Sequence, residues 1–360
     1  MKASAGASDS GAKSGLRNRG RALDLTQRSS LLIAWVVLIV IFSVLYPSTF
    51  PTLDNFSSIF GSQAYVAVLA LGLIIVLRVG EFDLSVAATM TMGSVMLAVL
   101  DVQHGISPGL AVVITLAVGA LIGITNGMLV VGFGVDSFIA TLGVATIIQG
   151  LALWISHQET IVGVSDVFVN FTVVHRFLRI PLEFYYALAL MVLLAYFFRY
   201  TVLGRRLLFV GKNKEVARLS GIDVSRIKLG AFVATGIIGA FAGILYTGTG
   251  GTADPVSPLS YLLPVYAAAF LGATTRTTGE FSAVGTCVAV YFLVTGVQGL
   301  AIGGVTGYVQ QIFYGGALIV AVTASRLLRN RQVRLLAAEK PAEKPVEPPG
   351  ADPTAATGSP

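Results

Sequence analysis

Residues 199–228 read RYTVLGRRLLFVGKNKEVARLSGIDVSRIK, and they form the one long polar interruption in a chain that is otherwise mostly apolar. The stretch carries eight basic side chains against two acidic ones, and apolar runs of membrane-span length lie on both sides of it. In membrane proteins, short loops rich in Lys and Arg stay on the cytoplasmic side. The loop is therefore predicted to be cytoplasmic and to fix the orientation of the segments around it.

The loop also carries the pattern of a short helix. Asn213 is a favourable N-cap, and Glu215 lies in the first turn, where the helix dipole favours a negative charge. Gly221 offers the left-handed position that ends a helix, and Asp223 can cap the helix that follows. Apolar residues recur at a spacing of three: Val216, Leu219 and Ile222. The pattern indicates either a solvated basic loop that only sets topology, or a short amphipathic helix that enters a groove on a partner protein.

The composition is that of a membrane protein. The chain of 360 residues is 55% hydrophobic and 12% charged, with a mean hydropathy of +0.81, whereas soluble domains are about 25% charged. Its 40 glycines suit close helix packing in lipid. The net charge of +6 comes from tails and loops, so we interpret it as a topology signal and expect no nucleic-acid partner. Cys287 is the only cysteine, which excludes an internal disulfide and a cysteine metal site.

Ten apolar runs approach the roughly 17–25 residues that a membrane span needs. The predicted fold class is all-α, a polytopic membrane protein with about ten transmembrane helices, some of them broken or re-entrant. One permease domain, 29–328, lies between tails at 1–28 and 329–360 that are expected to be disordered. The even number of spans and the basic flanks predict that both termini are cytoplasmic. The predicted spans are 29–47, 64–79, 84–101, 109–132, 137–156, 184–200, 229–248, 260–275, 281–300 and 307–326.

No catalytic constellation is evident in the sequence. Gly211-Lys212 lacks the preceding glycine and the following Ser or Thr of a phosphate-binding loop. The three histidines are scattered over segments predicted to be external, and nothing resembles a catalytic triad or a metal cluster. We therefore expect no enzyme activity and no cofactor in this chain.

Ionisable residues at membrane depth are costly and usually functional, and they gather in two places. The first is LRVGEFDLSV with Arg78, Glu81 and Asp83, and the second is TTRTTGEFSAVG with Arg276 and Glu280. Both contain Gly-Glu-Phe before a helix rich in small residues, which suggests a weak internal repeat. The segments indicate either tight turns at the cytoplasmic interface, with Asp83 or Ser85 capping a helix, or turns that line the inner end of a translocation path.

The polar motifs of the chain occur in a definite order. Phe82-Asp83-Leu84-Ser85-Val86 comes first, and it is followed by Asn126-Gly127, residues 137–143, the loop motifs at 204–206 and 211–222, and Leu271-Gly272-Ala273. This ordered set, over about residues 45–330, resembles the ribose-type sugar permeases of bacterial ABC importers, whose signature is Gly-Gly-Ile-Asp-Leu-Ser-Val-Gly. The chain departs from it at Gly80-Glu81 and Ala87, and at 274–278, where the family has a Gly-rich turn.

The resemblance implies the remaining assignments. Such permeases form a dimer, usually of identical chains, in the bacterial inner membrane. Cytoplasmic ATPases dock on their coupling segments, and an external solute-binding protein delivers a sugar. The residues that couple to the ATPase would be Asn213, Glu215, Val216, Arg218, Leu219, Gly221 and Ile222. The residues of the translocation path or of its helix turns would be Glu81, Asp83, Ser85, Asn126, Thr141 and Glu280.

Other function classes stay open at this point. A permease of the same superfamily would carry branched-chain amino acids or another small solute. An ion-coupled secondary transporter would use buried charges near the middle of the membrane, for which Glu81, Asp83 and Glu280 are the candidates. A scaffold or receptor membrane protein would transport nothing.

Overall fold

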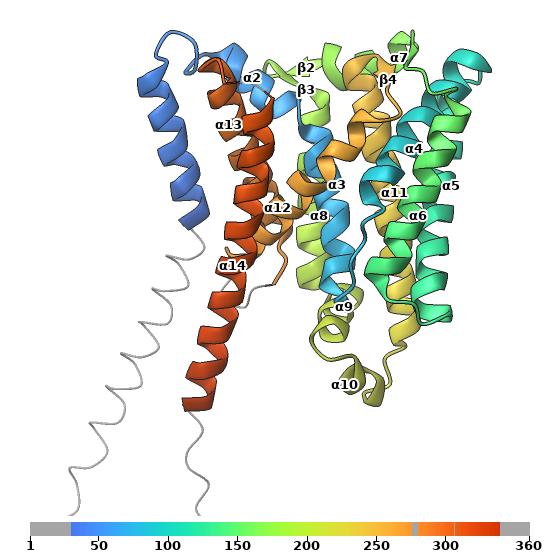
Figure 1. Cartoon of the computed structure of the whole chain (residues 1–360), viewed down its shortest axis with the longest axis vertical. Helices are drawn as coiled ribbons and strands as arrows, with labels where there is room; N and C mark the ends of the chain where they lie inside the picture. Colours follow the sequence, from blue (N-terminus) through green and yellow to red (C-terminus); the bar gives the residue numbers. More distant parts are fainter. Residues whose placement is uncertain (1–29, 276–279, 306, 339–360) are drawn as a thin grey trace, which may run out of the picture.

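The computed structural model is a bundle of helices and describes residues 30–275, 280–305 and 307–338 (Figure 1). The predicted tail at 1–28 lies outside the described residues, as do residues 339–360 of the tail predicted at 329–360. The last helix continues to Ala338, past the predicted domain boundary at 328. In chain order the helices are α2 (Leu53–Gly61), α3 (Ala64–Arg78), α4 (Val86–Ala98), α5 (Pro108–Gly127), α6 (Ser137–Ile155), α7 (Asp166–Val169), α8 (Leu182–Tyr200), α9 (Val202–Lys212), α10 (Lys214–Leu219), α11 (Val224–Gly250), α12 (Leu262–Ala273), α13 (Ala283–Ile302) and α14 (Tyr308–Ala338).

The apolar helices coincide with the ten predicted spans. Within the described residues, seven helical stretches are long and apolar enough to cross a membrane: Leu53–Arg78, Val86–Gln103, Pro108–Gly132, Ser137–Ile155, Leu182–Tyr200, Val224–Gly250 and Ala283–Ile302. The other three predicted spans correspond to shorter apolar helices: Ser30–Leu45, Ser257–Ala273 and Tyr308–Thr323. The all-α polytopic fold is confirmed. Strand is confined to two short pairs in the described part of the chain, β1 (Ile161–Val162) with β4 (Thr252–Ala253) and β2 (Arg176–Phe177) with β3 (Ile180–Pro181).

Helix α3 is the centre of the bundle. Every residue from Ala64 to Arg78 is buried, and the helix is apolar on all sides. A helix that is apolar on all sides is buried, either among other helices or in lipid. Here α8, α11, α12 and α13 pack around it, so the end of α3 at Arg78 is held in the interior of the bundle.

Helix α11 crosses α5 at glycines. Gly119 and Gly123 lie four residues apart on α5, and a Cβ atom built on Gly236 of α11 would lie 2.2 Å from the Gly119 carbonyl oxygen. Only glycine permits this approach of two backbones, which is the usual way that helices gain packing contacts in lipid. Because α11 also packs on α3 and α4, this crossing fixes its first turns beside the end of α3.

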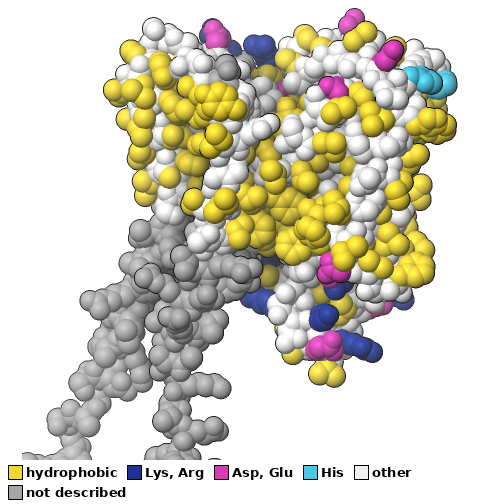
Figure 2. All heavy atoms as spheres, in the orientation of Figure 1, with side chains coloured by type: hydrophobic (Ala, Val, Ile, Leu, Met, Phe, Trp, Pro, Cys, Tyr) yellow, Lys and Arg dark blue, Asp and Glu magenta, His cyan; other side chains and the backbone are white. Residues whose placement is uncertain are grey.

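The two ends of the bundle differ from its middle. Figure 2 shows an apolar band around the middle of the visible face, with charged side chains above and below it. The upper end in Figure 1 carries α2, α7 and the strand pairs, whereas the lower end carries α9 and α10, and α14 also extends downwards at one side. We call the lower end the loop end, because residues 199–228 lie there.

Candidate functional site: two helix breaks at the loop end

The first helix break is residues 79–85, between α3 and α4. Val79 and Gly80 form a turn, Gly80 has a φ of +81°, and the next three residues have no regular secondary structure. The end of this segment is deeply buried, since Asp83 is 2% exposed. A buried backbone N–H without a partner is costly, so the break needs hydrogen-bond acceptors from neighbouring helices.

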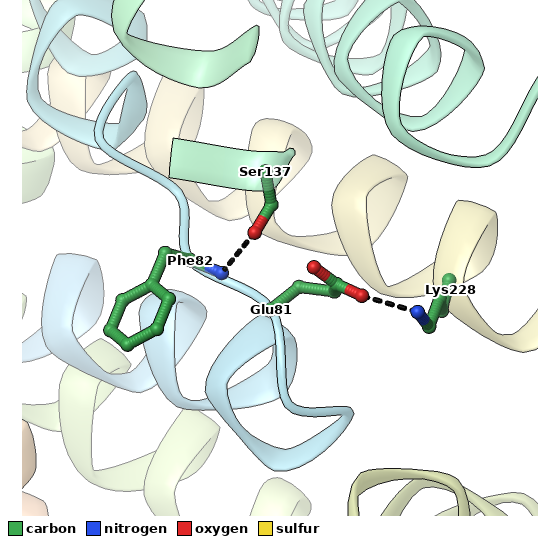
Figure 3. Close-up of polar contacts among 4 residues, drawn as sticks. All are labelled: Glu81, Phe82, Ser137 and Lys228. Carbon is green, nitrogen blue, oxygen red and sulfur yellow. Dashed lines mark hydrogen bonds and ion pairs between the residues drawn. The ribbon is translucent and has the colours of Figure 1, made fainter. Parts of the chain in front are cut away.

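Two hydroxyl groups of α6 supply acceptors on one side of the break. The Phe82 N–H donates to Ser137 Oγ at 3.1 Å (Figure 3), and the Leu84 N–H donates to Thr141 Oγ1 at 3.0 Å. Residues four apart on a helix are separated by about 6 Å along its axis, and residues two apart on an extended chain by about 6.6 Å. The two spacings match, so one turn of α6 satisfies alternate N–H groups of the first break.

The other side of the first break is bonded to α12 and α5. The Asp83 N–H donates to Tyr266 Oη at 3.1 Å. The Asp83 carboxylate accepts from the Ser85 N–H and hydroxyl, and Asn126 Nδ2 of α5 donates to Ser85 Oγ at 2.7 Å. Ser85 occupies the N-cap of α4, but its hydroxyl makes no capping bond. Asp83, Ser85, Asn126 and Thr141 are thus brought together and buried, where they hold the start of α4.

Each break carries a glutamate that forms an ion pair with the basic loop. Glu81 of the first break pairs with Lys228 of α11 (Figure 3). The second break is residues 274–282, between α12 and α13, and its Glu280 pairs with Lys212 of α9 at 2.8 Å. The first pair is sheltered, with side-chain exposures of 14% for Lys228 and 15% for Glu81. In the second pair Glu280 is 15% exposed but Lys212 is 58% exposed.

Arg78 connects the two breaks to each other. It is the last residue of α3, and its Nη1 donates to the Phe281 carbonyl oxygen of the second break at 2.5 Å. Its guanidinium also lies 4.2 Å from the centre of the Phe198 ring on α8, a cation–π contact. Glu81 and Glu280 do not touch, but this buried arginine joins their segments. Residues 276–279, which include part of the second charged motif, lie outside the described residues.

Helix α9 brings the loop against the first break, and the sequence analysis did not predict it. Thr201 caps the helix by accepting from the Gly204 N–H, and Leu207 and Val210 bury its apolar side. Near its end, a Cβ atom built on Gly211 would lie 2.0 Å from the Arg78 carbonyl oxygen. The two backbones are therefore in direct contact. The apolar residues spaced along 203–210 were the sequence signal for this helix, but the arginines among them made the segment read as part of a polar loop.

The local structure predicted for the loop is confirmed. The Asn213 side chain accepts from the Glu215 and Val216 N–H groups at the start of α10. Gly221 has a φ of +76°, in the left-handed region, and the Asp223 side chain caps α11.

The structure agrees only in part with the prediction that Val216, Leu219 and Ile222 form one apolar face. Val216 is 45% exposed and Leu219 is 88% exposed. Ile222 instead packs against the hydrophobic core of its own chain, and Ala217 is fully buried. Gly221 turns the chain between Leu219 and Ile222, so the helical spacing does not continue through it. The outward apolar surface of α10 therefore consists of Val216 and Leu219.

Comparison with known proteins identifies the family. Residues 55–322 match the family described as "Branched-chain amino acid transport system / permease component". The chain belongs to this permease family. The L-arabinose ABC transporter permease protein of Azospirillum brasilense is 29% identical, over 88% of this chain and 92% of that protein. The D-allose transport system permease protein of Escherichia coli is 31% identical over 81% and 89%, and the ribose import permease protein of Bacillus subtilis is 31% identical over 81% and 90%. No solved structure matches the chain.

Membership in the permease family sets the role of the chain. It is a multi-pass protein of the inner membrane and the transmembrane permease subunit of an ABC importer. ATP hydrolysis belongs to a separate subunit, and a solute-binding protein is the other partner of such an importer. The family description names branched-chain amino acids, whereas the three relatives named above carry sugars in their names.

Proposed function

We propose that this permease imports a monosaccharide. The observation that carries the proposal is the similarity to three monosaccharide permeases over at least 81% of the chain. This similarity includes both helix breaks and the basic loop, and it extends over most of each relative. The branched-chain amino acids of the family description are the alternative substrates, and they belong in the same experiment.

We propose further that the loop end is cytoplasmic, together with both termini. The support is the density of basic residues in 199–228, since loops of this kind stay inside. In this orientation the upper end in Figure 1 faces the solute-binding protein. The permease then works as a dimer of two identical chains, with the two helix breaks at the inner end of the translocation path.

Helix α10 is proposed to be the docking element for the ATPase. It projects from the loop end of the bundle, and its exposed Val216 and Leu219 are apolar side chains that a partner groove would cover. Asn213 and Gly221 shape the two ends of the helix. Glu215 and Arg218 are assigned to the charged rim of the contact, and Ile222 is assigned to anchoring the helix on its own bundle.

Uptake by the complete importer tests the proposed function. The permease is reconstituted in liposomes with its ATPase and its solute-binding protein, and uptake of labelled ribose, allose, arabinose and leucine is compared. We expect ATP-dependent uptake of at least one of the sugars and none of leucine. Uptake of leucine and of none of the sugars would mean that the substrates are branched-chain amino acids. Uptake driven by an ion gradient without ATP would contradict the ABC mechanism.

Cysteine labelling tests the orientation separately. In a Cys287→Ala background, single cysteines at Ser10, Asn213 and Thr354 should stay unlabelled by an impermeant thiol reagent added to intact cells. Labelling of all three from outside would reverse the proposed topology.

A further inference from the structure

The two ion pairs lie on either side of α10 in the chain. Lys212 is the last residue of α9 and directly precedes Asn213, the N-cap of α10. Lys228 lies just inside α11, the helix that follows α10. One lysine pairs with the first break and the other with the second break. Both connections of α10 to the bundle therefore carry an ion pair to a different break.

The contacts around these pairs are close enough to transmit a displacement. Gly211, beside Lys212, is in backbone contact with Arg78 at the end of α3. Arg78 in turn bonds to Phe281, the neighbour of Glu280. Side chains packed this tightly shift together and do not deform independently. A movement of α10 thus has a path through adjoining residues to both breaks.

Glu81 stands next to the bond that holds the first break on α6. Its neighbour Phe82 donates its N–H to Ser137, and in Figure 3 the two interactions lie side by side. A displacement of Lys228 would therefore move the Glu81 carboxylate, which belongs to the residue next to this hydrogen bond. Because the pair is sheltered from water, its attraction is stronger than that of an exposed pair.

We infer that Lys228 and Lys212 are positioning residues that couple the ATPase-docking helix α10 to the two helix breaks, through Glu81 and Glu280. The inference rests on the proposed docking of the ATPase on α10. When the ATPase moves α10, the two lysines carry the movement to both breaks, and the chain segments there change their packing. Because the ion pairs link the segments that flank α10 to the two breaks, their loss should uncouple ATP hydrolysis from the opening of the translocation path.

Thiol reactivity at the first break measures this coupling without any transported solute. A Phe82→Cys variant in the Cys287→Ala background is reconstituted with the ATPase. Its rate of reaction with a thiol reagent on the loop side is measured without nucleotide and with MgATP and vanadate. We expect the two rates to differ by about tenfold, within the range of couplings between protein sites. Glu81→Gln or Lys228→Gln should bring this ratio close to one, while ATP hydrolysis continues.

Charge exchange distinguishes coupling from a merely structural role. The double variant Glu81→Lys with Lys228→Glu reverses both charges, and it should restore most of the nucleotide-dependent difference, as should the conservative Lys228→Arg. Arg226→Gln is the matched control, because Arg226 lies in the same turn but pairs with Asp223 inside the loop. It should leave the difference unchanged.

Several results would overturn the inference. They are an unchanged nucleotide-dependent difference in Glu81→Gln, a double variant no better than the single ones, or no difference in the parent complex. If the parent shows the difference but transports none of the sugars, only the proposed substrate class fails. The Lys212→Gln variant provides a second measurement at the more exposed pair, and it should reduce the nucleotide-dependent difference in thiol rate less than Lys228→Gln does. If neither lysine variant changes this difference, the coupling is contradicted.

Discussion

The two helix breaks share the sequence Gly-Glu-Phe but differ in how firmly the bundle holds them. At the first break, three consecutive backbone N–H groups donate to hydroxyls of α6 and α12, and the Glu81–Lys228 pair is sheltered at both ends. At the second break, within the described residues, Arg78 bonds to Phe281, the Phe281 ring packs against Phe270, and the Gly285 N–H lies 3.4 Å from its acceptor on Ser282. Lys212 is largely exposed there. The same triplet is therefore held in two different ways.

This comparison indicates that the strength of each contact depends on the burial and the partners around the triplet, and not on the triplet itself. Removing one partner of a buried ion pair costs about 3–5 kcal/mol, whereas an exposed pair contributes roughly 0–1 kcal/mol. A buried N–H that loses its acceptor costs about 1–3 kcal/mol. The first break is thus expected to be the more sensitive one, and each prediction below tests this ranking.

The largest effect is expected from the hydroxyls that hold the first break. Ser137→Ala with Thr141→Val removes the acceptors of two partly buried N–H groups, at up to about 1–3 kcal/mol each. Ser282→Ala at the second break removes one N-cap, which costs typically about 1 kcal/mol. The measurement is the thermal unfolding temperature of the purified permease in detergent.

A threonine on the same helix serves as the control. Thr146 is exposed, and its hydroxyl donates to the Leu142 carbonyl within α6. Thr146→Val should change stability by less than about 0.5 kcal/mol, as surface substitutions usually do. A double variant at Ser137 and Thr141 that unfolds at the same temperature as Ser282→Ala would abolish the ranking of the two breaks.

The next effect separates the two ion pairs. Lys228→Gln leaves Glu81 charged in a sheltered place, so its cost should fall between those of exposed and buried pairs, at about 1–3 kcal/mol. Lys212→Gln should cost less than about 1 kcal/mol, since Lys212 is mostly in solvent. High salt should weaken the Lys212 pair more, because exposed charges are screened.

Unfolding temperatures of both lysine variants, at low and high salt, measure this difference. Lys214→Gln is the control, because Lys214 is an exposed lysine at the start of α10. If the unfolding temperature falls equally in the Lys228→Gln and Lys212→Gln variants, burial does not distinguish the two ion pairs.

Much of the fold follows from the sequence, because it depends on local composition. The ten apolar runs and the caps at Asn213 and Asp223 were predictable. These features depend on hydrophobicity and on hydrogen bonds between near neighbours. Gly221 was likewise readable as the end of α10, since its left-handed backbone favours glycine.

The assembly of the site was not predictable, because it depends on contacts between distant residues. The charged residues at 78–83 and Glu280 were identified as important, but nothing in the sequence pairs Glu81 with Lys228 or Glu280 with Lys212. Tyr266 lies 183 residues from the backbone N–H that it binds. The spacing rule placed Ile222 on the same face as Val216 and Leu219, but the turn at Gly221 directs it onto the core of its own chain.

The smallest effect on stability is expected at the tip of α10, where the effect on function should be large. Leu219 is almost fully exposed, so Leu219→Asp removes little packing and should leave the unfolding temperature unchanged. If α10 enters a groove of the ATPase, the new carboxylate is buried there without a partner, and recovery of the ATPase with the permease should fall sharply. Arg218→Glu, one residue away, should reduce recovery much less, because exposed ion pairs contribute only about 0–1 kcal/mol. Normal recovery of the ATPase and normal uptake with Leu219→Asp would mean that α10 is a spacer, and the two lysines beside it would then have no movement to transmit.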